Sequence, residues 1–359
     1  MDKDKGLVKV LKEGFGLHGA RLNFMSCFIK AMIIVRSVTM SSLASALNPM
    51  VYPESNEKRL KRFFGQIKLS KTSYGKFILR LLSEEKSYVL SLDRTNWKIG
   101  SVNINILMLG ICHQRIAIPL AWKLLDKRGN SSTRERLDLL DEVLAYLPAS
   151  AVEAIVADRE FIGKAWFKGL KQRKLCFVMR LRNDTLVGSK AKNIAASKRY
   201  AHLSKAETYV CPKRVWIYGL RLHLAVTKSQ KGELVVLASN AKPEFAFVRY
   251  AQRWGIECLF SALKKRGFNF EDTRLTQTNR LDNLIILLSI AFTWAHLMGK
   301  WVYQHRPLKP KKHGYLPVSF FKRGLDYLRT AILATDNKVA KIPMLLANCC
   351  EMACAKMDA

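Results

Sequence analysis

Acidic residues are scarce in this sequence. The 359 residues include 28 Asp and Glu against 61 Lys and Arg, which gives a formal net charge of +33 and a sequence pI of about 10.0. The basic excess is spread along the chain, and the low-complexity basic extensions typical of ribosomal proteins are absent. Because 49% of the residues are hydrophobic, we expect a folded protein with a sizeable core that binds polyanions. Nucleic acid is the favoured polyanion, and an anionic membrane surface is the weaker alternative.

Paired cysteines are also missing. None of the eight forms a Cys-x-x-Cys pair, and several lie in apolar stretches, which is typical of reduced core thiols in a cytosolic protein. The cluster Cys349-Cys350-Glu-Met-Ala-Cys354 lacks a partner pair at zinc spacing, so we expect no metal site there. The other cysteines are Cys27, Cys112, Cys176, Cys211 and Cys258.

Long apolar runs and targeting signals are absent as well. The longest run, Leu284 to Met298, has about 15 residues, which is short of the ~20 that a membrane span needs. We interpret it as a buried helix in which His296 is a core histidine rather than a ligand. The charged N-terminal residues are followed by no small-residue cleavage site, which predicts no signal peptide. We therefore expect no membrane partner.

Residues 1–85 are expected to form a basic helical region. Helical periodicity runs through Glu57–Phe64 and Tyr74–Leu82, after a break at Asn48–Ser55. Short helices rich in Lys and Arg suit a DNA-binding region, whose minimum role is to hold phosphates. The alternative is a packed helical cap with a solvated basic face.

Residues 86–303 predict a mixed sheet covered by helices, and hence an α/β fold. A β subdomain is inserted at 182–242, where three short runs have the pattern of antiparallel strands and Ser229–Gly232 that of a hairpin turn. The expected strands are 88–93, 102–112, 115–125, 152–158, 174–181, 214–218, 220–227 and 233–238. The expected helices are 131–147, 163–173 and 280–303. Residues 304–359 predict a basic linker at 306–313 and a helical C-terminal region with a helix at about 319–333.

The stretch from Tyr250 to Lys264 carries the most informative polar residues. Pro243 is expected to open a helix there, and on a regular helix four polar residues share a face only about 60° wide. They are Tyr250, Arg253, Glu257 and Lys264. An exposed ion-pair face is one interpretation. The other is a site in which Glu257 binds a metal ion and the cations hold phosphates.

Two aspartates upstream favour the site. Asp93 and Asp158 each follow an apolar run, so each is expected at the carboxyl end of a strand, where α/β sheets place their sites. A turn or helix cap is the alternative for such a residue. Hard divalent ions prefer oxygen ligands, and two of them can clamp the attacking and leaving oxygens of a phosphoryl displacement. With Glu257, the aspartates supply the three carboxylates that such a site needs.

The four residues of the stretch also match a family signature. Their spacing is Tyr-(2)-Arg-(3)-Glu-(6)-Lys, in which the sequence resembles DDE transposases of the insertion sequence 4 family. Leu92–Trp97 and Ala157–Phe161 look like the two Asp motifs of that family, and Phe321–Tyr327 like its C-terminal pattern. The resemblance covers roughly residues 40–330.

This resemblance implies a ribonuclease-H-like catalytic core with a triad of Asp93, Asp158 and Glu257. It implies two Mg²⁺ ions, for which Mn²⁺ would substitute, with Asp93 as the bridging ligand and the other two as single-ion ligands. The implied reaction is cut-and-paste transposition of an insertion sequence. It proceeds by phosphodiester hydrolysis and strand transfer at terminal inverted repeats, through a DNA hairpin in characterised relatives.

The resemblance also implies the partners. Double-stranded DNA would be bound as terminal inverted repeats and as target, with Tyr250, Arg253 and Lys264 on its phosphates. Relatives act as homodimers, and the expected location is the bacterial cytoplasm, on the nucleoid.

An aromatic residue would stack on a base that is flipped during hairpin formation. Trp216 is our candidate, followed by Trp97 and Trp254, and a tryptophan that packs a small β core is the alternative. Glu160 lies close to Asp158 in the sequence, but we expect a structural role for it.

Two other functions stay open. One is a two-metal nuclease or recombinase of the same fold that acts without strand transfer. The other is a catalytically silent DNA-binding protein, which the presence of all three carboxylates argues against.

Overall fold

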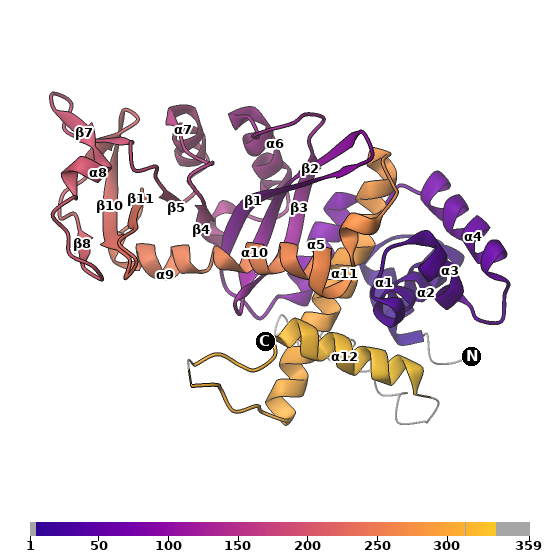
Figure 1. Ribbon diagram of the computed structural model, residues 1–359. Coiled ribbons are helices and arrows are strands. Elements are labelled where there is room, and N and C mark those ends of the chain that lie inside the picture. Colours follow the sequence, from indigo (N-terminus) through magenta and orange to yellow (C-terminus); the bar gives the residue numbers. More distant parts are fainter. Residues whose placement is uncertain (1–4, 313, 335–359) are drawn as a thin grey trace. The chain divides into compact units, whose positions relative to one another are not determined.

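The computed structural model describes residues 5–312 and 314–334 (Figure 1). The chain divides into two compact units, one made of residues 1–84, 97–102 and 260–359 and the other of residues 85–96 and 103–259. The predicted functional regions 1–85, 86–303 and 304–359 stay predictions, because compactness assigns no function. The Cys349–Cys354 cluster lies outside the described residues.

The first unit is helical, as predicted for its N-terminal part. The predicted break at 48–55 separates α3 from α4, which begins at Pro53, where the missing N–H costs no helical hydrogen bond. The helices are α1 (Lys5–Gly14), α2 (Gly19–Val35), α3 (Met40–Leu47), α4 (Pro53–Gln66), α5 (Lys71–Leu81), α11 (Thr278–His305) and α12 (Phe320–Leu333).

Helix α11 forms the core of this unit. By length and composition it could cross a membrane, as could α2 and α3 taken together as one bent pair, but 94% of its most apolar window is buried inside the fold. His296 is 1% exposed, in keeping with the expected core histidine. Helix α12 crosses α11 so closely that a Cβ at Gly299 would lie 1.8 Å from the Phe320 carbonyl oxygen. The glycine is therefore required by packing.

The second unit contains an 11-stranded sheet, whose core half follows the order β3-β2-β1-β4-β5. Strands β1, β4 and β5 are parallel, whereas β3 is antiparallel to β2. Helices α6 and α7 lie side by side, and α9 packs on β4, β5 and β11 (Figure 1). The elements are β1 (Tyr88–Ile99), β2 (Val102–His113), β3 (Ile116–Leu124), α6 (Thr133–Leu144), β4 (Val152–Ala157), α7 (Lys164–Gln172), β5 (Phe177–Arg180) and α9 (Ala246–Ala251). The mixed α/β prediction is confirmed.

Helix α6 begins with a serine cap. The Ser132 hydroxyl accepts a hydrogen bond from the Glu135 backbone N–H at 3.2 Å, and the Glu135 carboxylate accepts one from the Ser132 N–H at 2.6 Å. This reciprocal capping box satisfies two donors that the helix leaves unpaired.

The inserted β region continues the same sheet from β5 through β11 and β10. Its predicted strands and the turn at Ser229–Gly232 are present, and Gly232 adopts a φ of 84°. The short strands β6, β7 and β8 and the short helix α8 were not predicted. The elements are β6 (Leu186–Gly188), β7 (Asn193–Ala195), α8 (Ala196–Arg199), β8 (Thr208–Val210), β9 (Val215–Ile217), β10 (Leu220–Lys228) and β11 (Leu234–Ser239).

The expected continuous helix through Tyr250 and Lys264 is wrong. Pro243 opens a single 3-10 turn before α9, and a new helix, α10 (Trp254–Ser261), follows a break at residues 252–253. From Ala262 to Gly267 the backbone is π-helical. Regular pitch therefore does not hold, and the four polar residues do not form one 60° strip.

Candidate active site

Asp93 and Asp158 lie on neighbouring parallel strands. Leu92 of β1 pairs with Ala157 of β4, so each aspartate comes one position after a paired residue. Because residues in register on parallel strands face the same side of the sheet, this places the two half-buried carboxylates together. Asp158 directly follows β4, as expected. Asp93 does not end its strand, because β1 runs on to Ile99 beside β2.

The surroundings of Asp93 favour a nearby positive charge. Burial raises the pKa of Asp93 to about 6, although the Arg94 backbone N–H and the Arg253 guanidinium both lower it. The carboxylates of Glu160 and Asp158 add to the increase. An ionised Asp93 is thus costly unless a cation or a hydrogen-bond donor compensates for it.

Arg253 supplies such a cation between two of the predicted triad residues. Its Nη2 lies 2.5 Å from Glu257 Oε1, and its Nη1 lies 3.7 Å from Asp93 Oδ2. The residue is only 9% exposed, and its buried Nε–H has no acceptor within the described part of the chain. Arg253 lies in the break between α9 and α10, so the irregular backbone directs this guanidinium toward the carboxylates.

Tyr250 reaches the third carboxylate. Its hydroxyl donates a hydrogen bond to Asp158 Oδ1 at 3.3 Å. Burial raises the pKa of Tyr250 to about 12, and the neighbouring Asp158 contributes to the increase. The phenol is therefore neutral at physiological pH and acts as a donor. Tyr250 and Arg253 together connect Asp158, Asp93 and Glu257.

The donor atoms suit a hard divalent ion, but the carboxylates are not gathered around one point. Within the described ranges, no group of three or more His, Cys, Asp or Glu side chains is placed to hold a metal ion. The guanidinium of Arg253 supplies the positive charge next to Asp93 and Glu257 instead. Three carboxylates are the oxygen ligands that Mg²⁺ and Mn²⁺ prefer, so the chemistry of the set fits such an ion once Arg253 moves aside.

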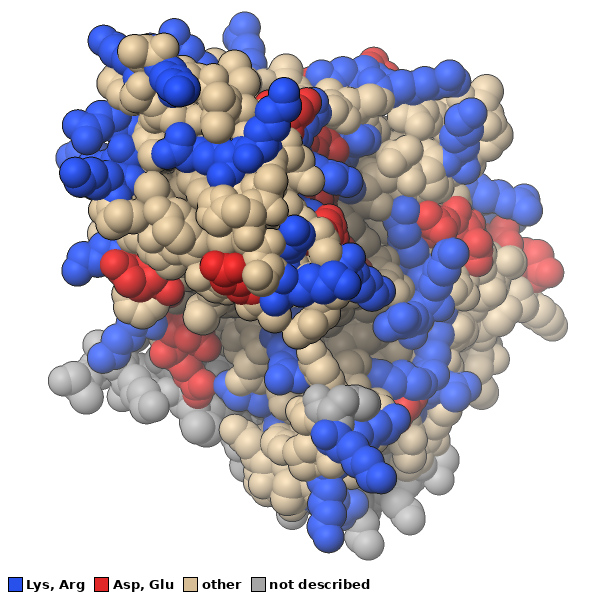
Figure 2. Space-filling view, turned by 60° about the vertical axis from the view of Figure 1, so that its left-hand side comes forward, with Lys and Arg blue, Asp and Glu red and all other residues tan. Residues whose placement is uncertain are grey.

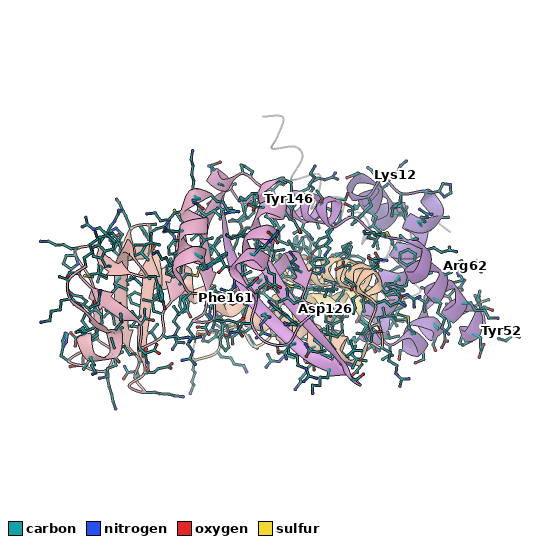
Figure 3. The ribbon with its side chains drawn as sticks, turned by 90° about the horizontal axis from the view of Figure 1, so that it is seen from above. Lys12, Tyr52, Arg62, Asp126, Tyr146 and Phe161 are labelled. Atoms are coloured by element: carbon teal, nitrogen blue, oxygen red, sulfur yellow. The ribbon has the colours of Figure 1, made fainter. Side chains whose placement is uncertain are left out.

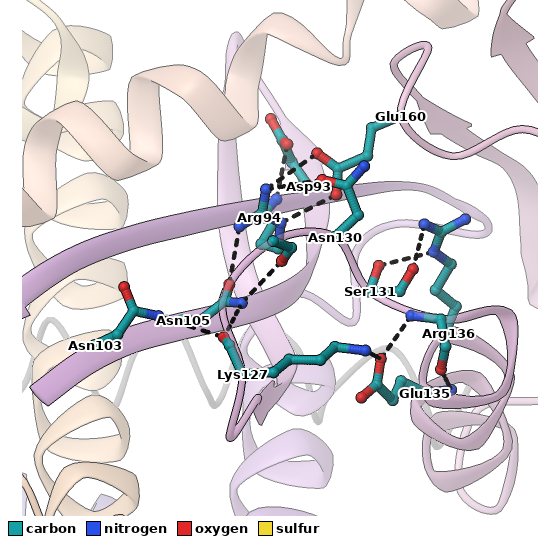
Figure 4. Close-up of polar contacts among 12 residues, drawn as sticks. Asp93, Arg94, Asn103, Asn105, Lys127, Asn130, Ser131, Glu135, Arg136 and Glu160 are labelled. Atoms are coloured by element: carbon teal, nitrogen blue, oxygen red, sulfur yellow. Dashed lines mark hydrogen bonds and ion pairs between the residues drawn. The ribbon is translucent and has the colours of Figure 1, made fainter.

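Glu160 pairs with an arginine instead of joining the carboxylates. Its Oε1 lies 3.0 Å from Nε of Arg94, which directly follows Asp93 (Figure 4). The expected structural role agrees with this contact. The pair joins residues 66 positions apart, which no local sequence pattern predicts.

Lys264 belongs to the other compact unit, together with Trp97. Its Nζ lies 2.7 Å from Glu271 Oε1 and 5.2 Å from the centre of the Trp97 ring. Lys264 therefore has partners of its own, and its position does not test a contact with the carboxylates.

The three tryptophans named from the sequence differ in exposure. Trp97 is buried, whereas Trp254 is 61% exposed. Trp216 is half-buried and lines a pocket of about 660 Å³. Lys190 Nζ lies 5.4 Å from the centre of the Trp216 ring, and Arg182 and Tyr218 also line the pocket. An aromatic wall next to cations is the kind of surface that a nucleotide base contacts.

Basic side chains dominate the visible surface. Figure 2 shows Lys and Arg over much of this face and far fewer Asp and Glu. In the helical unit, α4 buries Leu60, Phe63 and Phe64 and exposes Lys58 and Arg62 on its other side. Arg62 points outward from the helix (Figure 3). The exposed side of α4 carries the positive charge that binding to a phosphate backbone requires.

Two solved structures show a weak likeness to this chain. A solved structure described as the piggyBac transposase synaptic complex with hairpin DNA is 14% identical, with a TM-score of 0.47, and the match covers 97% of this chain and 83% of that one. Endonuclease V from Bacillus subtilis is 8% identical, with a TM-score of 0.25, and 67% of this chain and 96% of that one are covered. Both TM-scores are low, so neither likeness establishes a shared fold. No curated protein sequence matches this chain.

A family model gives the firmer result. The model described as the transposase DDE domain matches residues 108–294, a segment that includes Asp158 and Glu257 and begins after Asp93. The match covers more than half of the chain, and we conclude that the protein belongs to the transposase DDE domain family.

Proposed function

We propose that the protein is an active DDE transposase of the insertion sequence 4 type, with Asp93, Asp158 and Glu257 as its catalytic triad. The observation that carries this proposal is the Leu92–Ala157 register, which brings Asp93 and Asp158 together on parallel strands. Glu257 is linked to Asp93 through Arg253. The strand order β3-β2-β1-β4-β5, with β1, β4 and β5 parallel, supports a ribonuclease-H-like core.

The triad would hold two Mg²⁺ ions, which Mn²⁺ could replace. Asp93, Asp158 and Glu257 would supply the carboxylate ligands. Bound there, the ions would activate a water and stabilise the charge that develops at phosphorus. Asp93 is the central carboxylate of the set, since it neighbours Asp158 in the sheet and is linked to Glu257 through Arg253.

The remaining polar residues would position DNA. Arg253 has a guanidinium that can leave Glu257 for a phosphate, to which it could donate two parallel hydrogen bonds. Tyr250 would donate from its neutral hydroxyl, and Lys264 would add a further cation at the backbone. The substrates would be the terminal inverted repeats and the target DNA, bound by a homodimer on the bacterial nucleoid.

The Trp216 pocket would receive a base if the reaction passes through a hairpin. Its half-buried ring and the adjacent Lys190 support base stacking with phosphate contact. The exposed Trp254 is the second candidate, whereas the burial of Trp97 makes it unsuitable.

The test is cleavage of DNA that carries the inverted repeats flanking the gene, with Mg²⁺ supplied or withheld. Asp93→Asn, Asp158→Asn and Glu257→Gln are each expected to abolish cleavage and to retain end binding in a gel-shift assay. Full cleavage by any of them would refute the triad. Cleavage without strand transfer would favour a nuclease or recombinase, and DNA binding without cleavage a silent DNA-binding protein.

A further inference from the structure

A polar network beside Asp93 has no part in the proposed function so far. At its centre is the Arg94 side chain, which donates to three different acceptors (Figure 4). Nε lies 3.0 Å from Glu160 Oε1, Nη1 lies 3.1 Å from Asn105 Oδ1 and Nη2 lies 3.3 Å from Asn130 Oδ1. A guanidinium bonded along three directions has little freedom to rotate.

This arginine is coupled directly to the first carboxylate of the triad. The Arg94 backbone N–H donates to Asp93 Oδ1 at 2.7 Å, so the same residue that is fixed by the network also orients the Asp93 carboxylate.

The acceptors of Arg94 are held in place as well. Asn105 is 2% exposed, and its Nδ2 donates to the carbonyl oxygens of Lys127 at 2.9 Å and Gly129 at 3.1 Å. These bonds order the loop that contributes Asn130. Arg94 therefore lies in a socket, formed by these acceptors, that contacts within the protein hold in place.

Glu160 connects this socket to the second carboxylate. It lies in the turn that follows β4, in which the Phe161 N–H donates to the Asp158 carbonyl at 2.9 Å. The Phe161 ring is fully buried, with the Arg136 guanidinium 4.8 Å from its centre. The turn is held by Arg136 on one side and, through Glu160, by Arg94 on the other.

We infer that Glu160 and Arg94 form a positioning pair that fixes the spacing of Asp93 and Asp158, and that the pair thereby makes the site selective for Mg²⁺ over larger cations. This inference rests on the proposed function. Mg²⁺ demands near-ideal octahedral geometry with short bonds to oxygen, whereas Ca²⁺ accepts longer bonds and irregular geometry. A loosened pair of aspartates should therefore lose Mg²⁺ first. Glu160 itself contributes no ligand, because Arg94 occupies its carboxylate.

The test measures the affinities of the full chain for Mg²⁺ and for Ca²⁺ by isothermal titration calorimetry, without DNA. Glu160→Ala and Arg94→Ala are each expected to weaken Mg²⁺ binding by about 10–100-fold, as is usual for residues that orient metal ligands. Ca²⁺ binding should weaken by a smaller factor. The double variant should bind Mg²⁺ about as weakly as the single variant with the larger loss, because the two residues act as one unit.

A conservative variant and a matched control separate positioning from general stability. Glu160→Gln keeps an oxygen acceptor for Arg94 and should recover part of the Mg²⁺ affinity that Glu160→Ala loses. Asp141→Ala removes another Arg–carboxylate pair of the same unit, with Arg173 Nε 2.6 Å from Asp141 Oδ1, and should leave both affinities unchanged. Melting curves followed by circular dichroism verify that each variant is folded.

Unchanged Mg²⁺ affinity in folded Glu160→Ala would overturn the inference, as would equal losses of Mg²⁺ and Ca²⁺. These outcomes leave the proposed function intact if wild-type binding is still abolished by Asp93→Asn. Failure of the wild type to bind either ion, alone or with DNA, would instead count against the proposed function itself.

Discussion

The guanidinium of Arg253 lies 2.5 Å from the Glu257 carboxylate, four residues further along the chain. The same guanidinium faces Asp93 at 3.7 Å, so one buried cation balances two carboxylates that we assign to metal binding. Arg253 and a divalent ion would therefore compete for the same negative charge. The position of this cation between the two acids reduces the repulsion between them.

Replacing Arg253 with Met should strengthen divalent-ion binding in the absence of DNA. A charge about 4 Å away is worth roughly 1 kcal/mol in water and more at a partly buried site, so affinity should rise about fivefold or more. Calorimetric titration with Mn²⁺ measures this change. Arg249→Gln is the matched control, because Arg249 pairs with Glu153 in the same region at 2.9 Å and does not face the triad. Weaker Mn²⁺ binding in Arg253→Met would show that the arginine supports the ion.

Gly255 is expected to tolerate no side chain. A Cβ at this position would lie 2.7 Å from the Ile116 carbonyl carbon, so alanine must push α10 away from the start of β3. Overpacking of this kind costs about 1–3 kcal/mol and would displace Glu257, two residues along the same helix. The melting temperature and the rate of Mg²⁺-dependent cleavage should both fall in Gly255→Ala. Gly16→Ala meets nothing within 4 Å and should behave as wild type.

The exposed face of α4 should contribute phosphate contacts. Lys58 and Arg62 are exposed and four residues apart, so they lie on the same side of the helix. If both contact phosphates, Lys58→Gln/Arg62→Gln should reduce the slope of log K against log salt by about 2. Fluorescence anisotropy at several salt concentrations gives this slope. An equal change for Lys168→Gln/Lys171→Gln, which neutralises two exposed lysines of α7, would mean that only net charge matters.

The capping box of α6 should make stability depend on acid pH. Burial alone would raise the pKa of Glu135, but hydrogen bonds from Lys127 and Ser132 outweigh it and lower the value below 4.5. The ionised carboxylate therefore stabilises the fold above this pH, and its contribution is lost as pH falls through the lowered value. Glu135→Gln should cost about 1 kcal/mol at pH 7 and less at pH 3. Urea unfolding at the two pH values measures the difference in free energy of unfolding between variant and wild type. The same difference at both pH values would contradict this account.

Much of the second unit was predictable from local pattern. The run Val152–Ala157 is apolar and stops at Asp158, so both the strand and the position of its aspartate follow from sequence. The position of Asp93 within its strand was harder to predict, because residues 94–96 continue β1 although residues 94 and 95 are only partly buried and Asn96 is exposed. The pairing of β1 with its neighbours extends the strand beyond its apolar part.

The break before α10 was not predictable. Gln252 and Arg253 include neither proline nor glycine, so no residue at the break signals it, and the contact of Arg253 with Asp93 joins residues far apart in the sequence. The Arg94–Glu160 ion pair was not predictable for a related reason. Its partners are brought together by the sheet, and each is an ordinary charged residue in its own segment.

The register between β1 and β4 also restricts how this protein can diverge. Because side chains alternate along a strand, loss of one residue from 152–157 would turn Asp158 toward the opposite face. The segment between the two strands is under no such restriction, since a longer hairpin or loop leaves the pairing intact. In a set of homologous sequences, insertions and deletions should therefore accumulate at residues 100–101 and be absent from 88–93 and 152–158.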